Sequence, residues 1–275
     1  SPEKYYAMKG YKVVLSKQIL LDDIVWLYCR SGELGCSLDE KLKTNLIEKY
    51  TLLYKEIYEN NVGNGSCPSI HEYYQSWKLR GDNPQCYRLE EKEFNAALET
   101  TELVYFDRFR FNPRVDNNLR RNKRYRDLYY YYHFNKKVRE KGNEVTEFKV
   151  TKEYIKLVCI MQDKMIAELA CKGIGIETNP SSNYLIGTIK KYEEHPILRF
   201  NSRKLKATNT GENLCVSINT DDQGVFDTLL ENEYALMTLA LKKATDDDMN
   251  ALYDIEDIYE WIDYVRKMGI DQMFS

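Results

Sequence analysis

Residues 216–226 read VSINTDDQGVF, an apolar run that ends at a threonine and is followed by two adjacent acids, Asp221 and Asp222. A similar apolar run, GIGIETN, occupies residues 173–179. Short apolar runs bounded by turn residues are typical of buried strands, whereas helices need longer periodic segments. Both runs are therefore predicted to be strands, and both end in polar residues that can carry chemistry.

Helices are predicted on either side of these two strands. Thr151 can cap a helix whose apolar residues recur at helical spacing up to Leu169, and Gly173 supplies a left-handed stop. A further helix is predicted from Val225 to Ala244. The alternation of strands and helices indicates an α/β fold in which parallel strands are joined by right-handed crossovers.

The carboxyl ends of these strands are the candidate site. In parallel α/β folds, reactive side chains gather at that edge of the sheet, and residues 179–183 and 220–222 both occupy it. A carboxylate there can bind a divalent metal, while a neighbouring acid that points elsewhere can accept hydrogen bonds from a substrate. The alternative is a solvated turn in which the acidic pair only caps the following helix.

Four stretches of the C-terminal half occur in an order that resembles the C-terminal part of the adenosine deaminase family, of the metal-dependent amidohydrolase superfamily. The order and approximate spacing resemble the family across about residues 151–245, and the S-N-x-x-x-G and N-T-D-D elements are individually uncommon. Gln223 stands where the family usually has proline. The four stretches are ACKGIGIETNPSSNYLIG (170–187), EEHPILRF (193–200), VSINTDDQGVF (216–226) and LLENEYALMTLAL (229–241).

The resemblance implies zinc-dependent hydrolytic deamination of a purine nucleoside or nucleotide at C6. Asp221 corresponds to the family's aspartate zinc ligand, and Asp222 to the residue that hydrogen-bonds the purine base. The H-P-x-x-x-F element, in which the histidine is structural rather than catalytic, matches at residues 195–200. The residues predicted to be structural at the strand ends are Asn179, Ser182, Asn183, His195 and Thr220.

The family's chemistry also needs an H-x-H pair, an H-A-x-E motif and a further histidine. The three histidines of this chain are His71, His133 and His195, and none lies in H-x-H or H-x-x-E. One carboxylate does not hold catalytic zinc, which usually has three protein ligands. We therefore expect the chain alone to be inactive and to bind no zinc, with zinc and purine belonging to an intact parent protein.

The number of strands indicates a partial barrel. A complete (β/α)8 TIM barrel takes about 250 residues, whereas only two strands are convincing here, or three if KGYKVVL at 9–15 is counted. We expect a strongly helix-rich α/β chain, the C-terminal portion of a large bacterial adenosine deaminase-like protein, in one compact unit overall. An open sheet edge favours pairing with the N-terminal barrel part or with another chain. The expected regions are a residual barrel strand (1–17), a helical insertion (18–145) and the deaminase-like barrel segment (146–275).

The insertion is predicted to be mostly helical, and its clearest helix, at 37–59, begins with a capping-box pattern of Ser37 and Glu40. Residues 108–141 hold twelve Lys/Arg against three acids and are rich in tyrosine. One interpretation is an assembly surface, since the large deaminase-like proteins of bacterial defence systems, which this chain resembles, are oligomeric. The others are an amphipathic helix with a solvated basic face and a surface for RNA or single-stranded DNA. The candidate binding residues are Arg120, Arg121, Lys123, Arg124 and Arg126.

Composition limits the other classes of protein. The 275 residues are 43% apolar and 30% charged, with a net charge of -3, which excludes a protein that binds nucleic acid or anionic membranes over most of its surface. Seven cysteines without a C-x-x-C pair predict reduced thiols in the cytoplasm. No apolar run approaches the ~20 residues of a membrane span, so we expect no membrane partner. Candidate phosphate-binding cations, by proximity along the chain, are Arg199, Arg203 and Lys204.

Overall fold

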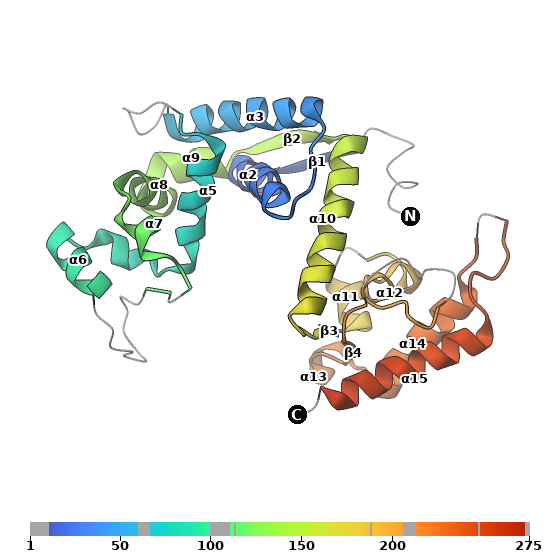
Figure 1. Cartoon of the computed structure of the whole chain (residues 1–275). Coiled ribbons are helices and arrows are strands. Elements are labelled where there is room, and N and C mark those ends of the chain that lie inside the picture. Colours follow the sequence, from blue (N-terminus) through green and yellow to red (C-terminus); the bar gives the residue numbers. More distant parts are fainter. Residues whose placement is uncertain are drawn as a thin grey trace. The chain divides into compact units, whose positions relative to one another are not determined.

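The chain is helix-rich and of mixed α/β type (Figure 1). The beginning of the expected strand at 9–15 and two arginines of the basic segment, Arg108 and Arg110, lie outside the described residues. The computed structural model describes residues 11–59, 67–99, 111–112, 114–187, 189–205, 213–246 and 248–272.

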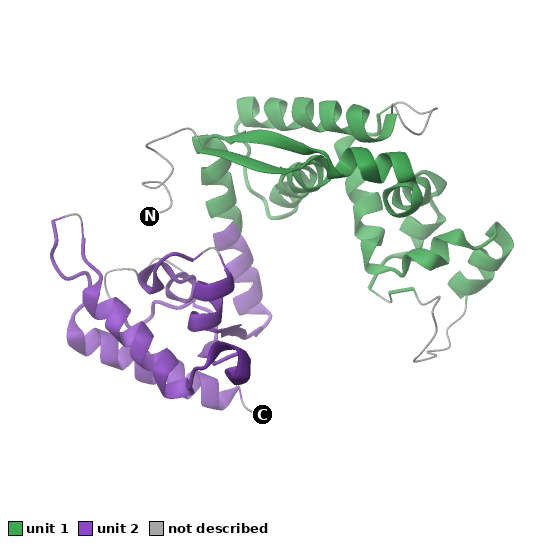
Figure 2. Ribbon diagram, turned by 180° about the vertical axis from the view of Figure 1, so that it is seen from behind, with its two compact units in different colours: residues 1–161 green, residues 162–275 purple. Residues whose placement is uncertain are grey.

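Two compact units, coloured separately in Figure 2, replace the one unit that we expected: unit 1 is residues 1–161 and unit 2 is residues 162–275. The expected boundary at 145/146 lies instead at the start of a strand, β2 (Val145–Val150), which belongs to unit 1. The division falls within a helix, α10 (Lys152–Cys171).

Unit 1 is mainly helical. Its α2 packs against α3 and α5, and α5 packs against α8. The elements are β1 (Tyr11–Ser16), α2 (Lys17–Glu33), α3 (Glu40–Tyr54), η1 (Lys55–Glu59), α5 (Ile70–Lys78), η2 (Leu79–Gly81), η3 (Pro84–Arg88), α6 (Glu91–Glu99), α7 (Asn117–Arg121), α8 (Lys123–Phe134), α9 (Lys136–Asn143), β2 and the first part of α10.

The strand expected to be a third barrel strand forms, as β1, but it does not join the other two. It pairs antiparallel with β2, from Tyr11 opposite Val150 to Ser16 opposite Val145. Lys17 and Glu144, which continue these two strands, are joined by a backbone hydrogen bond of 2.8 Å and by an ion pair. The prediction of a residual barrel strand at 1–17 is therefore wrong, because a strand's sequence does not specify which segment it pairs with.

The long helix expected at 37–59 begins later and changes character near its end. Asp39, rather than Ser37, caps α3 by accepting hydrogen bonds from the amides of Lys41 and Leu42. Aspartate caps at least as well as serine, so two nearby caps compete. The last turn, η1, is a π-helix, which turns Tyr58 into the core with less than 2% of its surface exposed.

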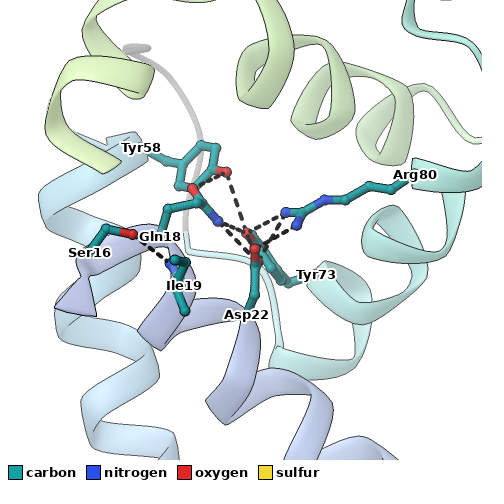
Figure 3. A network of polar contacts seen from close by, with 7 residues as sticks. All are labelled: Ser16, Gln18, Ile19, Asp22, Tyr58, Tyr73 and Arg80. Carbon is teal, nitrogen blue, oxygen red and sulfur yellow. Dashed lines mark hydrogen bonds and ion pairs between the residues drawn. The ribbon is translucent and has the colours of Figure 1, made fainter. Parts of the chain in front are cut away.

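A polar network ties four elements of unit 1 together (Figure 3). Asp22 of α2 accepts hydrogen bonds from Gln18, from the Tyr73 hydroxyl of α5 and from Arg80 of η2. Tyr58 of η1 donates to Gln18 Oε1 at 3.0 Å. Burial raises the pKa of Tyr58 and of Tyr73, so both hydroxyls keep their protons and donate.

Unit 2 has a two-stranded parallel sheet, as the sequence predicted. Thr178 of β3 lies opposite Ile218 of β4, and the apolar β4 side chains pack with α14 and α15, where Trp261 is fully buried. No helix in the described part of the chain is long and apolar enough to cross a membrane. The elements are the rest of α10, β3 (Ile176–Thr178), α11 (Pro180–Ile186), η4 (Tyr192–Glu194), α12 (Ile197–Phe200), β4 (Val216–Ile218), α13 (Gln223–Phe226), α14 (Leu230–Lys243) and α15 (Ile255–Asp271).

The single helix predicted from Val225 to Ala244 is two helices, α13 and α14. Asp227, at φ 46°, ends α13 in the left-handed conformation. Aspartate tolerates this conformation better than most residues with a Cβ, because its short polar side chain bonds locally. The break separates the turn after β4 from the long helix that covers the sheet.

Candidate functional site

The parallel register of β3 and β4 brings the two polar strand ends to one edge of the sheet. Asn219 donates its backbone amide to the Thr178 carbonyl at 2.8 Å, which carries the pairing one residue past β4. The Thr178 hydroxyl donates to the carbonyl of Ser217 at 2.7 Å. These bonds fix the starting points of two segments, 179–183 after β3, which includes the first turn of α11, and 219–222 after β4.

Asp221 joins these two segments. Its Oδ2 accepts a hydrogen bond of 2.8 Å from the hydroxyl of Ser182, which is only 2% exposed. Asp221 itself is exposed and lies at φ 59°, in the left-handed region. Aspartate adopts this conformation more readily than most residues with a Cβ. The bond to Ser182 leaves the second carboxylate oxygen, Oδ1, for another partner.

Asp222 caps a helix and does not bind Ser182. Its Oδ1 accepts a hydrogen bond of 3.0 Å from the Gly224 amide and so caps α13, which begins at Gln223. The helix-capping interpretation therefore holds for Asp222 and not for Asp221. The two acids diverge, as adjacent side chains must, and Asp222 keeps one oxygen, Oδ2, outside the capping bond.

Asn183 and His195 brace the segment after β3. The Nδ1 of His195 accepts from the Ile197 amide at 3.1 Å, so Nε2 carries the proton and donates to Asn183 Oδ1 at 3.0 Å. The same oxygen accepts from the Asn179 amide at 3.3 Å. At Gly187, which ends α11, a Cβ would collide with the carbonyl oxygen of Asn183. These contacts fit structural roles for the residues of the S-N-x-x-x-G element.

Protonation of His195 is expected to destabilise unit 2 as the pH falls. Burial lowers the pKa of His195 from 6.5 to about 4, against a smaller opposing effect of Glu233. Between these values the unfolded chain binds a proton that the folded chain does not, so stability is complete above pH 6.5 and is lost toward pH 4. At about pH 5 the loss is about 2 kcal/mol.

This pH dependence can be measured by urea unfolding near neutral pH and near pH 5, in the wild type and in His195→Gln. The variant is less stable at neutral pH but lacks the titrating ring. We expect it to lose about 2 kcal/mol less than the wild type between the two conditions. An equal loss in both proteins would show that His195 is not the titrating group.

Thr220 lies between β4 and the acidic pair, and its hydroxyl donates to the carbonyl of Asp221 at 3.2 Å.

Glu233 of α14 is a site residue that the sequence-based prediction missed. Its side chain is fully buried, and it accepts hydrogen bonds from the Ser181 amide at 2.8 Å and from the Thr228 hydroxyl at 2.7 Å. Its position, four residues before the buried Met237, was the available signal, because it places an acid in the apolar stripe of a helix.

The residues present do not fit a zinc site by themselves. Across the described ranges, no group of three or more His, Cys, Asp or Glu side chains could hold a metal ion. Asp221 offers one carboxylate, whereas catalytic zinc needs about three protein ligands. His71 and His133 belong to unit 1, where His71 contacts Cys29 and burial lowers the pKa of His133 to about 4.

The basic residues are largely engaged within the protein. Arg120 is only 3% exposed and forms an ion pair with Asp82, so its assignment to a binding surface is wrong. The candidate basic residues on α8 also form ion pairs with acids: Lys123 with Asp127, Arg124 with Glu72 and Arg126 with Glu91.

The candidate phosphate-binding residues of unit 2 have partners as well. Arg199 pairs with Asp163, and Lys204 pairs with Glu260. Arg203 lies over the ring of Tyr264. A phosphate would therefore have to compete with acids for two of these three cations.

Part of the chain is similar to a known family. Residues 157–254 match the family model described as adenosine deaminase. This range contains β3, β4, the segment at 179–183 and both acids of the site. A search of curated proteins gives no match.

Proposed function

Because residues 157–254 of this chain match the adenosine deaminase family model, we propose that they form the carboxylate-bearing part of a deaminase site that acts on a purine nucleoside or nucleotide. The reaction would be hydrolysis at C6, in which water supplies the oxygen, the C6–N bond breaks and ammonia leaves. In this proposal β3 and β4 are the last two strands of a barrel. The rest of the site would come from another segment or chain.

The hydrogen bond between Ser182 and Asp221 is the observation that supports this proposal most directly. It joins the segments that follow two parallel strands, at the edge where α/β enzymes place their reactive groups. Asp221 would hold a zinc ion only together with ligands from another segment or chain. Asp222 would accept a hydrogen bond from the purine through the oxygen that does not cap α13.

The test uses a protein that contains this chain together with the segment that supplies the histidines, and it measures zinc content and ammonia release from adenosine. We expect Asp221→Asn to lose zinc and turnover together. Asp222→Asn should keep zinc and raise KM for the purine by about 10–150-fold, the effect of one hydrogen bond to a charged group. The 275-residue chain alone should release no ammonia.

Asp227 provides the matched control, since it is also an exposed acid with a positive φ in unit 2. Asparagine tolerates positive φ, so each Asp→Asn change removes a charge without adding strain. Asp227→Asn should retain zinc and activity. Equal zinc loss in the Asp221 and Asp222 variants would contradict the division of roles, and full activity of Asp221→Asn would contradict the proposal itself.

A nucleic-acid surface on α7 and α8 stays a weaker prediction, because Arg120 is internal and its basic neighbours on α8 have acidic partners. Arg121 and Lys123 are exposed and can be changed to glutamate without disturbing the Asp82 pair. Oligomerisation and a cytoplasmic location likewise stay predictions.

A further inference from the structure

Glu233 is an acid with no place in the proposed chemistry, yet it lies fully buried in the first turn of α14. Burying a carboxylate costs several kcal/mol unless hydrogen bonds satisfy it. The Ser181 amide, 52 positions away in sequence, and the Thr228 hydroxyl provide those bonds. A leucine here would avoid the cost of burying a carboxylate but would leave the Ser181 amide without this acceptor, so the acid does more than fill the core.

Glu233 and Asp221 bind two consecutive residues, Ser181 and Ser182. Ser181 donates its amide to Glu233 Oε2, and Ser182 donates its hydroxyl to Asp221 Oδ2. Both serines are buried. A shift of the Ser181 backbone would therefore move the Ser182 hydroxyl away from Asp221.

We propose that Glu233 is a positioning residue for the candidate site: it fixes the first turn of α11 so that Ser182 binds Oδ2 of Asp221 and leaves Oδ1 free. This inference rests on the proposed function only for the purpose of the arrangement, which is to hold the Asp221 carboxylate in one orientation before a ligand binds. Carboxylates that bind metals are commonly oriented by such outer hydrogen bonds. Glu233 does not itself touch the substrate.

The experiment observes Asp221 directly, by NMR of the isotope-labelled 275-residue chain. The observed signals are the 13Cγ resonance of Asp221 and the amide resonances of Ser181 and Ser182. Ser182→Ala removes the hydroxyl and defines the shift that Asp221 shows when it loses this bond. We expect Glu233→Ala to shift the Asp221 signal in the same direction and by a comparable amount, with loss of exchange protection at the Ser181 amide.

Two variants separate positioning from general stability. In Glu233→Gln, the amide oxygen Oε1 can still accept the hydrogen bond from the Ser181 amide, and the amide nitrogen Nε2 can donate to the Thr228 hydroxyl. That hydroxyl would then donate to the Leu229 carbonyl, which is 3.4 Å away. This variant should restore the wild-type Asp221 signal. Glu231→Ala, an exposed change in the same turn, should leave the signal unchanged.

The double variant Ser182→Ala/Glu233→Ala should shift Asp221 no further than Ser182→Ala alone, because the effect of Glu233 passes through the Ser182 hydroxyl. Additive shifts would overturn the inference, as would an unchanged Asp221 signal in Glu233→Ala. If Glu233→Ala does not fold, Glu233→Asp replaces it, since its shorter side chain cannot reach both partners. No turnover is measured, so failure of the deaminase proposal and failure of this inference give different results.

Discussion

Replacing Asp82 with alanine is expected to lower the free energy of unfolding of unit 1 by about 3–5 kcal/mol, the usual effect of removing one partner from a buried ion pair. The Asp82 side chain is fully buried, and its two oxygens accept from Nε and one terminal nitrogen of Arg120 at 2.9 and 2.7 Å. They also accept from the Tyr87 hydroxyl and the Asn112 amide. Alanine would leave all of these donors buried without this acceptor.

The loss can be measured by urea unfolding of a chain labelled with 5-fluorotryptophan. Trp26 and Trp77 lie in unit 1 and Trp261 in unit 2, so their 19F resonances follow the two units separately. Lys123→Ala is the control, because it breaks an exposed pair with Asp127 and should cost less than about 1 kcal/mol. Equal costs for the two variants would show that the Asp82 pair is not desolvated.

Replacing Asp22 with alanine is expected to cost about 3 kcal/mol, somewhat less than the Asp82 change, because the Asp22 and Arg80 side chains are 17% and 20% exposed. Water can reach the Arg80 guanidinium that is left unpaired, but the Tyr73 hydroxyl beside it is deeply buried. Arg80 also lies over the ring of Tyr132, so its loosening should spread from α2 to α8.

The same 19F experiment measures this loss, which should appear at Trp26 and Trp77 and not at Trp261. Tyr58→Phe is a graded control: it removes one hydroxyl that donates to Gln18 and leaves the ion pair intact, so it should cost about 1 kcal/mol. If the Asp22→Ala chain were as stable as the Tyr58→Phe chain, the expected cost of leaving the Arg80 guanidinium unpaired would be contradicted.

Local features of the fold could be predicted because short stretches encode them. The strands at 176–178 and 216–218 are apolar runs too short for helices. Thr151 accepts the capping bond of α10, and Gly173 has the positive φ expected of a helix stop. The helix start expected at Ser37 was wrong because Asp39, two residues later, competes for the same task.

The candidate site could be predicted only in part. Asp221 and Asp222 were identified from their place after β4, but the bond from Ser182 to Asp221 depends on the pairing of β3 with β4. Arg120 was assigned to a surface because charge runs are commonly solvated. It is internal because Asp82, 38 positions earlier, lies against it.

The sequence by itself predicted the strands β3 and β4, most of the helices that flank them, and the presence of two acids beside a strand end, and residues 157–254 match the adenosine deaminase family model. These properties depend on residue type and on spacing over a few positions. Only the tertiary structure decided that β1 pairs with β2, that Asp222 caps a helix while Asp221 binds Ser182, and that Glu233 holds the first turn of α11. Those outcomes depend on distances between residues far apart in the chain, which packing sets and local sequence does not.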